Sequence, residues 1–154
     1  MVFEHKVGDL FTTELPAMGH GVNVYGLMGA GIAKVVANLF PSVLPPYKEA
    51  CKRKLLVPGG LQFVKTAERE NFYVLNLASQ DKPGKHARLE WLDSSLRSAV
   101  QFCQDEGLEG LAIPRIAAGI GGLDWESQVR PLMEQIASEY DDVMVEIWSM
   151  PDAD

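Results

Sequence analysis

The sequence predicts an α/β protein in which helices cover both faces of a largely parallel central sheet. Short apolar segments, typical of buried strands, alternate along the chain with segments whose apolar residues recur at helical spacing. This alternation favours parallel strands joined by helical crossovers. A length of 154 residues and an apolar fraction of 47% fit one domain with a substantial core. We expect this domain to span residues 1–149, with a short acidic tail at residues 150–154.

Six segments have the composition of strands: residues 5–7, 21–25, 61–64, 72–78, 110–113 and 143–148. The fourth of them is nearly all apolar, which predicts a strand that is buried on both faces. A Pro-Gly-Gly turn at residues 58–60 separates the third segment from the chain before it.

Three amphipathic stripes predict helices. The first comprises Ile32, Val35, Val36, Leu39 and Phe40 and is followed by Pro41, which should end the helix. The other two stripes run over residues 89–103 and 129–140, and a short additional helix is expected at residues 47–55.

The net charge of −7 argues against extended binding to a nucleic-acid backbone, because such proteins need a basic surface. It does not exclude small anions, since backbone N–H groups hold phosphates without any cation. No segment is long and apolar enough for a membrane span, and the N-terminus lacks a signal-peptide pattern. Two cysteines and three scattered histidines give no disulfide framework or metal-ligand spacing. We therefore expect a cytoplasmic monomer with no cofactor, metal or membrane partner.

Four segments follow predicted strands directly: residues 8–10, 26–31, 79–86 and 115–125. In open parallel sheets, ligands bind outside the carboxyl ends of the strands. If the strands are parallel, these segments meet at one edge of the sheet, where we expect the functional site.

Two of these segments are rich in glycine and lead into helices. Residues 26–31 (GLMGAG) and residues 117–122 (AAGIGG) match neither the dinucleotide fingerprint nor the P-loop. Glycines let the backbone approach a ligand, and a helix N-terminus presents free N–H groups to an anion. Two such loops at one edge suit a diphosphate, although each could also be an ordinary strand-to-helix turn.

Polar residues at the predicted strand ends offer further contacts. Asp9 could accept a hydrogen bond from an exocyclic amine or cap a turn, and Asn23 could bind a ribose hydroxyl or the backbone. Ser79, Gln80 and Asp81 form a polar cluster in which Asp81 could act as a general base, the alternative being a solvated loop.

Residues 8–11 (GDLF), 23–34 (NVYGLMGAGIAK), 73–80 (YVLNLASQ) and 113–125 (IPRIAAGIGGLDW) resemble the macrodomain family. The resemblance is closest to the compact subfamily of terminal ADP-ribose protein glycohydrolases and related bacterial ADP-ribosyl hydrolases. It implies a three-layer α/β/α fold around a mixed, largely parallel sheet of about six strands, with ADP-ribose at the strand carboxyl ends.

The resemblance also implies roles for individual residues. Asp9 and Leu10 would contact adenine, and Asn23 would lie near the distal ribose. Ser79 would contact the ligand from the next strand end. The distal ribose and phosphates would lie along Met28, Gly29, Ala30, Gly31 and Ile32. The diphosphate would lie along Ala118, Gly119, Ile120, Gly121, Gly122 and Leu123.

Two residues depart from the subfamily pattern. Gln80 stands where some members carry a lysine nucleophile, and Gly121 stands where some carry an aspartate. The resemblance then implies hydrolysis by direct attack of water, with Gln80 and Asp81 as the catalytic residues. The expected substrates are mono-ADP-ribosylated proteins in which an ester joins ADP-ribose to an acidic side chain. The alternatives are a non-catalytic reader of ADP-ribose, a phosphatase acting on ADP-ribose 1″-phosphate and, more weakly, release of ADP-ribose from nucleic acid.

Overall fold

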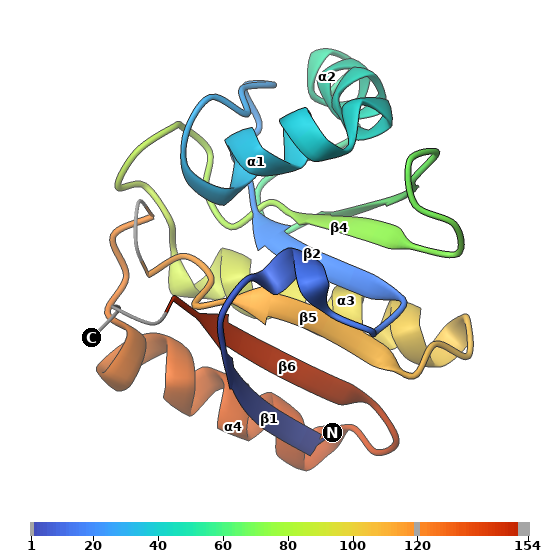
Figure 1. Cartoon of the computed structure of the whole chain (residues 1–154). Helices are drawn as coiled ribbons and strands as arrows, with labels where there is room; N and C mark the ends of the chain where they lie inside the picture. Colours follow the sequence, from blue (N-terminus) through green and yellow to red (C-terminus); the bar gives the residue numbers. More distant parts are fainter. Residues whose placement is uncertain (1, 119–120, 151–154) are drawn as a thin grey trace.

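The computed structural model describes residues 2–118 and 121–150, and it contains one six-stranded sheet (Figure 1). The strands are β1 (Val2–Val7), β2 (Ala17–Gly21), β3 (Leu61–Lys65), β4 (Tyr73–Leu77), β5 (Gly110–Pro114) and β6 (Met144–Ser149). Their order across the sheet is β1-β6-β5-β2-β4-β3. All neighbouring pairs are parallel except β3 with β4. The expected mixed, largely parallel sheet is confirmed.

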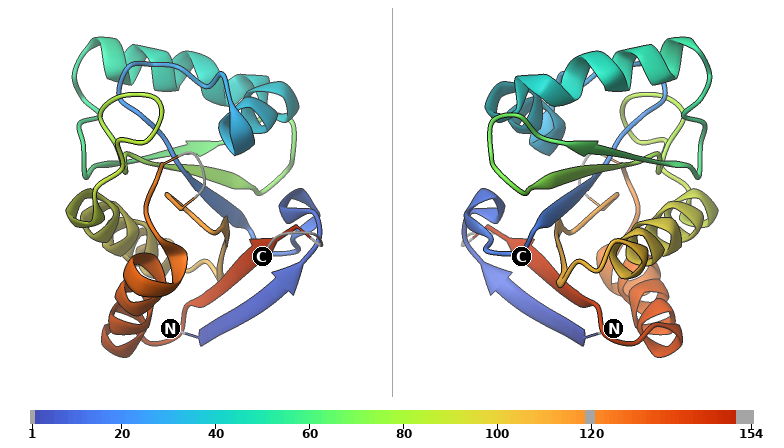
Figure 2. Two further views of the ribbon diagram at one scale, coloured as in Figure 1. Left: turned by 90° about the vertical axis from the view of Figure 1, so that its left-hand side faces the viewer. Right: turned by 90° about the vertical axis from the view of Figure 1, so that its right-hand side faces the viewer.

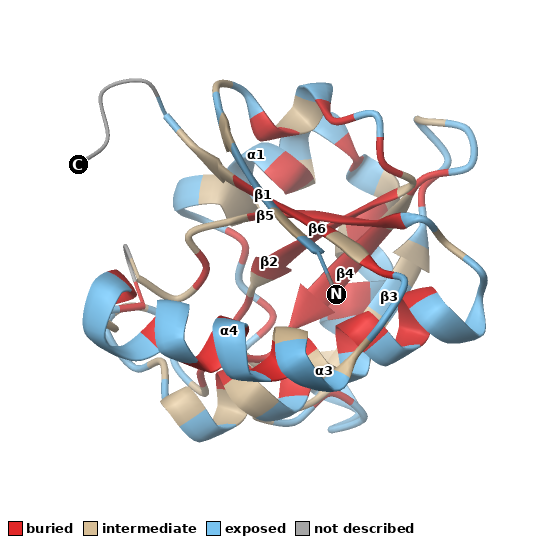
Figure 3. Ribbon diagram, turned by 90° about the horizontal axis from the view of Figure 1, so that it is seen from below, coloured by how far each residue is buried: buried red, intermediate tan, exposed pale blue. Residues whose placement is uncertain are grey.

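Helices cover both faces of the sheet. The helices are α1 (Gly31–Leu39), α2 (Leu44–Lys52), α3 (Leu89–Asp105) and α4 (Arg130–Glu139). Figure 2 shows α1 and α2 on one face and α3 and α4 on the other. Because successive strand residues point to opposite faces, Met18 joins the core under α1 and α2, whereas Ala17 joins the core under α3 and α4. Figure 3 shows the resulting buried strands between helices with exposed outer faces.

The second strand was wrongly predicted. β2 spans Ala17–Gly21, and residues 22–25 form a loop rather than the strand expected at 21–25. The Ala-Met-Gly-His-Gly sequence lacks the β-branched residues that usually mark a strand. Its small residues are set by packing instead, because a Cβ on Gly19 would come within 3.1–3.3 Å of Leu77, Ile113 and Leu111.

The predicted helices are present, with shifted boundaries. α2 begins at Leu44, before the expected start, and carries Pro45 and Pro46 in its first turn. Proline is tolerated there because the first N–H groups of a helix have no intrahelical partner. A π-helical turn at Trp125–Val129 leads into α4. Among residues 2–118 and 121–150, no helix is long and apolar enough to cross a membrane.

Candidate functional site

A cavity of about 720 Å³ opens at the carboxyl ends of β2, β4 and β5. From the end of β2 and the segment that follows it, residues 20–23 and 26–33 line the cavity. After β4 the cavity is lined by Ser79, Gln80, Pro83 and Gly84. From the end of β5 onward it is lined by residues 114–117 and Gly121. Leu44 and Lys48 of α2 complete the described lining. The expectation that both glycine-rich segments face one edge of the sheet is confirmed, because residues of both line this cavity.

The first glycine loop, residues 26–31, ends at a helix N-terminus that no side chain caps. Ala30 occupies the N-cap position of α1 in an extended conformation and makes no side-chain hydrogen bond. The first turn of α1 contains no acidic residue, and Gly31, Ile32 and Ala33 line the cavity. Free N–H groups and the positive end of the helix dipole therefore face the cavity. This arrangement favours an anion such as phosphate.

The second glycine loop, residues 117–122, leads to a helix N-terminus that is already capped. The Asp124 carboxylate accepts hydrogen bonds from the Ser127 amide at 2.8 Å and from the Ser127 hydroxyl at 2.6 Å. These bonds lower the pKa of Asp124 below its usual value. An anion would meet this carboxylate rather than free donors, so the two loops differ at their helices.

Main-chain contacts hold the described part of the second loop in place. The Gly121 carbonyl accepts a hydrogen bond from the Ala87 amide at 3.1 Å, and the Ala117 carbonyl accepts one from the Leu123 amide at 3.0 Å. Any Cβ on Gly121 would lie 2.6 Å from the Ala117 oxygen. Gly121 lines the cavity, but Ala118, Gly122 and Leu123 do not. Gly119 and Ile120, also predicted to contact ligand, lie outside the described residues.

Asn23 shapes the loop that carries the first glycines. Its side-chain oxygen accepts a hydrogen bond from the Tyr25 amide at 2.9 Å, and its side-chain nitrogen donates to the Leu27 carbonyl at 2.8 Å. The hydroxyl of buried Tyr47 in α2 donates to the Asn23 carbonyl at 2.7 Å. Asn23 lines the cavity as predicted, yet most of its hydrogen-bonding capacity fastens the loop to itself and to α2.

Gln80 also lines the cavity, and its amide organises the loop that follows β4. The Gln80 side-chain nitrogen donates to the carbonyls of Lys82 at 2.5 Å and Gly84 at 3.0 Å. Asp81 does not line the cavity; its carboxylate accepts a hydrogen bond from the Lys82 amide at 2.8 Å. The structure therefore brings one of the two predicted catalytic residues to the cavity and directs the other toward its own loop.

Asp9 and Leu10 lie apart from the cavity lining. Asp9 caps a short 3₁₀ helix, accepting a hydrogen bond from the Phe11 amide at 2.9 Å, and Leu10 is buried in the core under α1 and α2. Both residues follow β1, and the short 3₁₀ helix at Leu10–Thr12 packs near β5. The adenine contacts predicted for these residues stay predictions.

His20, which the sequence did not single out, belongs to a buried polar row under the first glycine loop. Its Nε2 lies 2.7 Å from the Asn76 side-chain oxygen, and the Asn76 side-chain nitrogen donates to the Gln62 side-chain oxygen at 2.9 Å. Gln62 in turn donates to the Pro46 carbonyl of α2 at 3.0 Å. The row crosses β2, β4 and β3 at matching register positions.

Burial lowers the pKa of His20 to about 4, although its hydrogen bond with Asn76 opposes the shift. The imidazole is therefore neutral at pH 7, and Nε2–H donates to Asn76. Two fully buried side-chain polar atoms have no partner among residues 2–118 and 121–150, namely His20 Nδ1 and Ser79 Oγ. Both residues line the cavity, so its floor retains unused hydrogen-bonding capacity.

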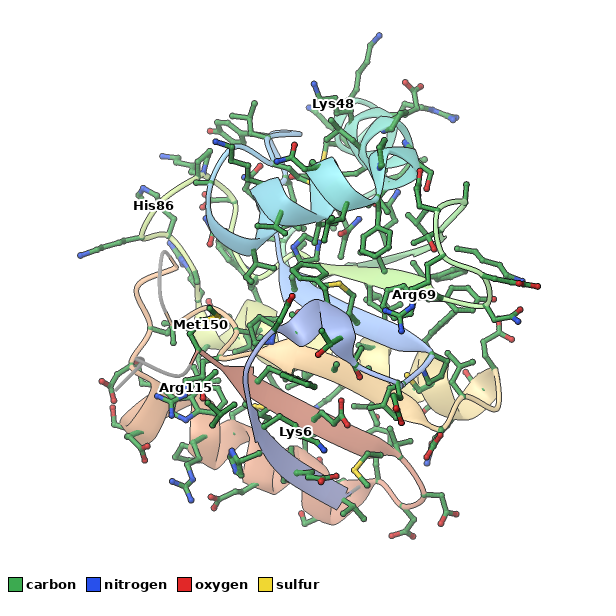
Figure 4. The ribbon with its side chains drawn as sticks, in the orientation of Figure 1. Lys6, Lys48, Arg69, His86, Arg115 and Met150 are labelled. Atoms are coloured by element: carbon green, nitrogen blue, oxygen red, sulfur yellow. The ribbon has the colours of Figure 1, made fainter. Side chains whose placement is uncertain are left out.

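The labelled side chains show how charge is placed around this edge. His86 and Arg115 lie on the side of the molecule where β5 and β6 end, whereas Arg69 lies on the opposite side (Figure 4). Arg115 lines the cavity and its guanidinium lies 5.7 Å from the centre of the Trp125 ring. The carboxyl end of β5 thus brings one cationic side chain, Arg115, to the cavity edge.

Comparison with known proteins places these features in a family. The model of the Macro domain matches residues 20–132. A DNA ADP-ribosyl glycohydrolase of Mycobacterium tuberculosis is 28% identical over 120 residues, covering 77% of this chain and 34% of the relative. The chain thus spans about a third of the length of that curated relative.

Solved structures agree with the family match. The macrodomain of Mycobacterium tuberculosis DarG has a TM-score of 0.86 and 26% identity, covering 96% of this chain and 97% of that one. Thermosipho africanus DarTG in complex with ADP-ribose has a TM-score of 0.85 and 27% identity, covering 98% and 42%. The family model matches more than half of the chain, the fold agrees with it, and this chain belongs to the macrodomain family.

Proposed function

We propose that this protein binds ADP-ribose in the cavity and hydrolyses the bond that attaches ADP-ribose to a larger molecule. The observation that carries the proposal is the uncapped N-terminus of α1, whose free N–H groups face the cavity. A volume of about 720 Å³ lies within the usual range of ligand pockets. A relative named as a DNA ADP-ribosyl glycohydrolase and a similar structure solved in complex with ADP-ribose support the same ligand.

In the proposed reaction the pyrophosphate lies against the first turn of α1. The distal ribose then extends toward Gln80 and the floor of the cavity. A water oxygen attacks the anomeric carbon, and the bond from that carbon to the linking atom breaks. The water proton passes to the leaving group or to solvent, giving free ADP-ribose and the released acceptor.

Gln80 is the proposed orienting group for that water. The Gln80 side-chain nitrogen donates both of its hydrogen bonds to carbonyls of its own loop. These two bonds fix the plane of the amide. The side-chain oxygen can then accept a hydrogen bond from water at a fixed position. Asp81 stays a predicted partner, and its carboxylate would have to leave the Lys82 amide to act.

The test is release of free ADP-ribose from three substrates: a mono-ADP-ribosylated protein, an ADP-ribosylated oligonucleotide and ADP-ribose 1″-phosphate. We expect turnover of at least one macromolecular substrate. Gln80→Ala should lower kcat by roughly 100-fold, the usual cost of losing the positioning of a reacting group. Gln101→Ala, on the exposed surface of α3, is the matched control and should leave kcat unchanged.

The outcomes separate the alternatives. Calorimetric binding of ADP-ribose without turnover of any substrate would indicate a reader, and turnover of the 1″-phosphate alone would indicate a phosphatase. A wild-type protein that gives no heat with ADP-ribose would overturn the proposal. The substrate expected from the sequence, a protein modified on acidic side chains, stays a prediction, as do the cytoplasmic location and the monomeric state.

A further inference from the structure

β3 leaves one side of its backbone without a strand beside it. Within the described part of the chain, the strand lies at the end of the sheet order and pairs with β4 alone, in antiparallel register. Just outside its two ends, the Gly60 carbonyl accepts a hydrogen bond from the Ala78 amide at 3.0 Å, and the Thr66 amide donates to the Phe72 carbonyl at 2.9 Å. The even-numbered residues of this segment therefore turn their main-chain groups toward β4.

The odd-numbered residues of β3 turn theirs to the free edge. In an antiparallel pair, alternate residues of a strand bond to the same neighbour, so Leu61, Phe63 and Lys65 direct their N–H and C=O groups outward. Among residues 2–118 and 121–150, these outward groups have no main-chain partner. A row of unpaired donors and acceptors is the feature through which a sheet takes up another strand.

Phe63 adds an apolar surface at the centre of this edge. Its ring stacks on that of Phe102 in α3, with the ring centroids 4.4 Å apart, yet 54% of Phe63 remains exposed. Two more apolar side chains, Leu55 and Val57, are exposed in the segment that leads into β3. A strand added beside β3 can bury the free part of the Phe63 ring, which favours association.

Unpaired cations precede and end this strand in the chain. Residues 48–65 contain five basic residues and one acidic residue, although the whole chain has a net charge of −7. Lys65 ends β3, and Lys52, Arg53 and Lys54, here called the basic run, precede the segment that leads into it; all four side chains are exposed. Where the structure describes the chain, no ion pair involves any of the four. Their charge is available to an external carboxylate.

The other edge of the sheet lacks this combination. β1 pairs with β6, and its one lysine, Lys6, forms an ion pair with Glu4 at 3.2 Å. Its one aromatic side chain, Phe3, is partly buried against the core under α3 and α4. An open backbone, an exposed ring and unpaired cations therefore occur together at β3 and not at β1.

We propose that the free edge of β3 binds an acidic, extended segment of a partner protein as an added strand. The main chain of that segment pairs with the outward groups of Leu61, Phe63 and Lys65. In an antiparallel arrangement, an apolar side chain opposite Phe63 covers its ring, and an acidic side chain two residues away lies opposite Lys65 on the same face. Further acidic residues beyond Leu61 are attracted by the basic run. The inference is independent of the ligand in the cavity.

Two other occupants fit this edge less well. A second copy of the chain would bring an identical basic run to the same edge and a net charge of −7 beside another of −7, and like charges repel. A nucleic acid would supply anionic oxygens, but its phosphate backbone has no N–H donor for the outward carbonyls. An acidic polypeptide supplies main-chain donors, main-chain acceptors and negative charge together.

The test uses an end-blocked peptide of sequence ETVTVEE. In antiparallel register its first glutamate, first valine and second valine face Lys65, Phe63 and Leu61. Fluorescence anisotropy of the labelled peptide measures the Kd, and hydrogen–deuterium exchange measures protection of the protein amides. We expect saturable binding, with slower exchange at the three outward amides of β3. The amides of Gln62 and Val64, which face β4, serve as the internal reference and should change less.

Two altered peptides separate main-chain pairing from charge. N-methylation of the first valine removes the N–H group that would bond at Phe63, and it should weaken binding about 10-fold. The peptide KTVTVKK keeps the apolar side chains and reverses the charge, so we expect no saturable binding to the protein.

Two protein variants probe the ring and the charge. Phe63→Ala should weaken binding of ETVTVEE about 10-fold, because it removes the apolar surface that the peptide covers. Lys65→Gln should weaken binding about 2- to 5-fold, as expected for loss of an exposed ion pair. Lys6→Gln, at the opposite edge of the sheet, is the matched control for loss of one lysine and should leave the Kd unchanged.

Four results would overturn the proposal. The first is the absence of saturable binding, and the second is equal affinity for the N-methylated peptide, which would exclude strand pairing. The third is displacement of the peptide by an equal concentration of a single-stranded oligonucleotide, which would show that charge alone accounts for binding. The fourth is a dimer in analytical ultracentrifugation that Phe63→Ala dissociates, because a second copy would then occupy the edge.

Discussion

The two glycine loops have similar sequences and positions but end in different helix N-termini. The first reaches α1 through Ala30, which makes no capping hydrogen bond, whereas the second reaches its helix through Asp124, which caps the Ser127 amide. The free donors of α1 face the cavity, and those of the second helix are satisfied within the protein. A single N-cap residue thus decides whether the first turn of the following helix keeps donors that an anion could use.

The strands that lead into the two loops differ as well. β2 carries His20, whose hydrogen bonds reach Asn76 and Gln62, whereas β5 has the sequence GLAIP and carries no ionisable group. The floor under the first loop is polar and the strand leading into the second is apolar. The two loops therefore meet the cavity from strands of different polarity.

The largest expected effect comes from giving the first loop the cap of the second. In Ala30→Asp, the new carboxylate should accept hydrogen bonds from the first turn of α1 and repel the ligand phosphates. We expect ADP-ribose affinity to fall roughly 100-fold or more, since like charges brought together cost several kcal/mol. Calorimetry measures the affinity. The reciprocal variant, Asp124→Ala, should lower the thermal midpoint slightly and leave the affinity within about twofold. A larger loss of ADP-ribose affinity in Asp124→Ala than in Ala30→Asp would contradict the difference between the two helix N-termini.

A second prediction tests the contrast between β2, which carries His20, and β5, which carries no ionisable group. The pKa of His20 is about 4 in the folded protein and near 6.5 in the unfolded chain, so the unfolded state binds more protons between these values. The contribution of neutral His20 to the free energy of unfolding is complete above pH 6.5. It is lost as the pH falls toward 4, by up to about 3 kcal/mol. Urea unfolding of wild type and His20→Asn at pH 7 and pH 4.5 measures it. The wild type should lose more stability than the variant; equal losses would show that His20 is not buried as a neutral ring.

The smallest effects concern space at one glycine of each loop. A Cβ on Gly29 would meet nothing within 4 Å, whereas a Cβ on Gly121 would lie 2.6 Å from the Ala117 oxygen. Gly121→Ala should therefore lower the free energy of unfolding by about 1–3 kcal/mol, the usual cost of overpacking. Gly29→Ala should change it by less than about 0.5 kcal/mol. Similar denaturation midpoints for both variants would show that the second loop yields as easily as the first.

The sequence predicted most of the fold because periodicity reports burial. The stripe from Ile32 to Phe40 located α1, although Val35 and Leu39 of that stripe are exposed. The apolar run at residues 72–78 contains β4. β2 was misplaced because its identity depends on neighbours far along the chain. Gly19 is required by the side chains of Leu77, Leu111 and Ile113, which no local pattern reveals.

The site was predicted at the level of segments and less well at the level of side chains. Strand ends and glycines located the cavity, because parallel topology brings them to one edge. The engagement of Asn23 and Gln80 with their own loops depends on backbone geometry that spacing does not encode. His20 was missed because a single histidine gives no signal until Asn76 and Gln62 are placed beside it.

One main-chain hydrogen bond, from Val24 to Asp81, joins the loops that follow β2 and β4. Any movement that separates these two loops must break this hydrogen bond. The exchange of the Val24 amide proton with deuterated solvent therefore reports opening of the entrance as a single event. The factor by which a bound nucleotide slows this exchange would measure how much it raises the free energy of local opening.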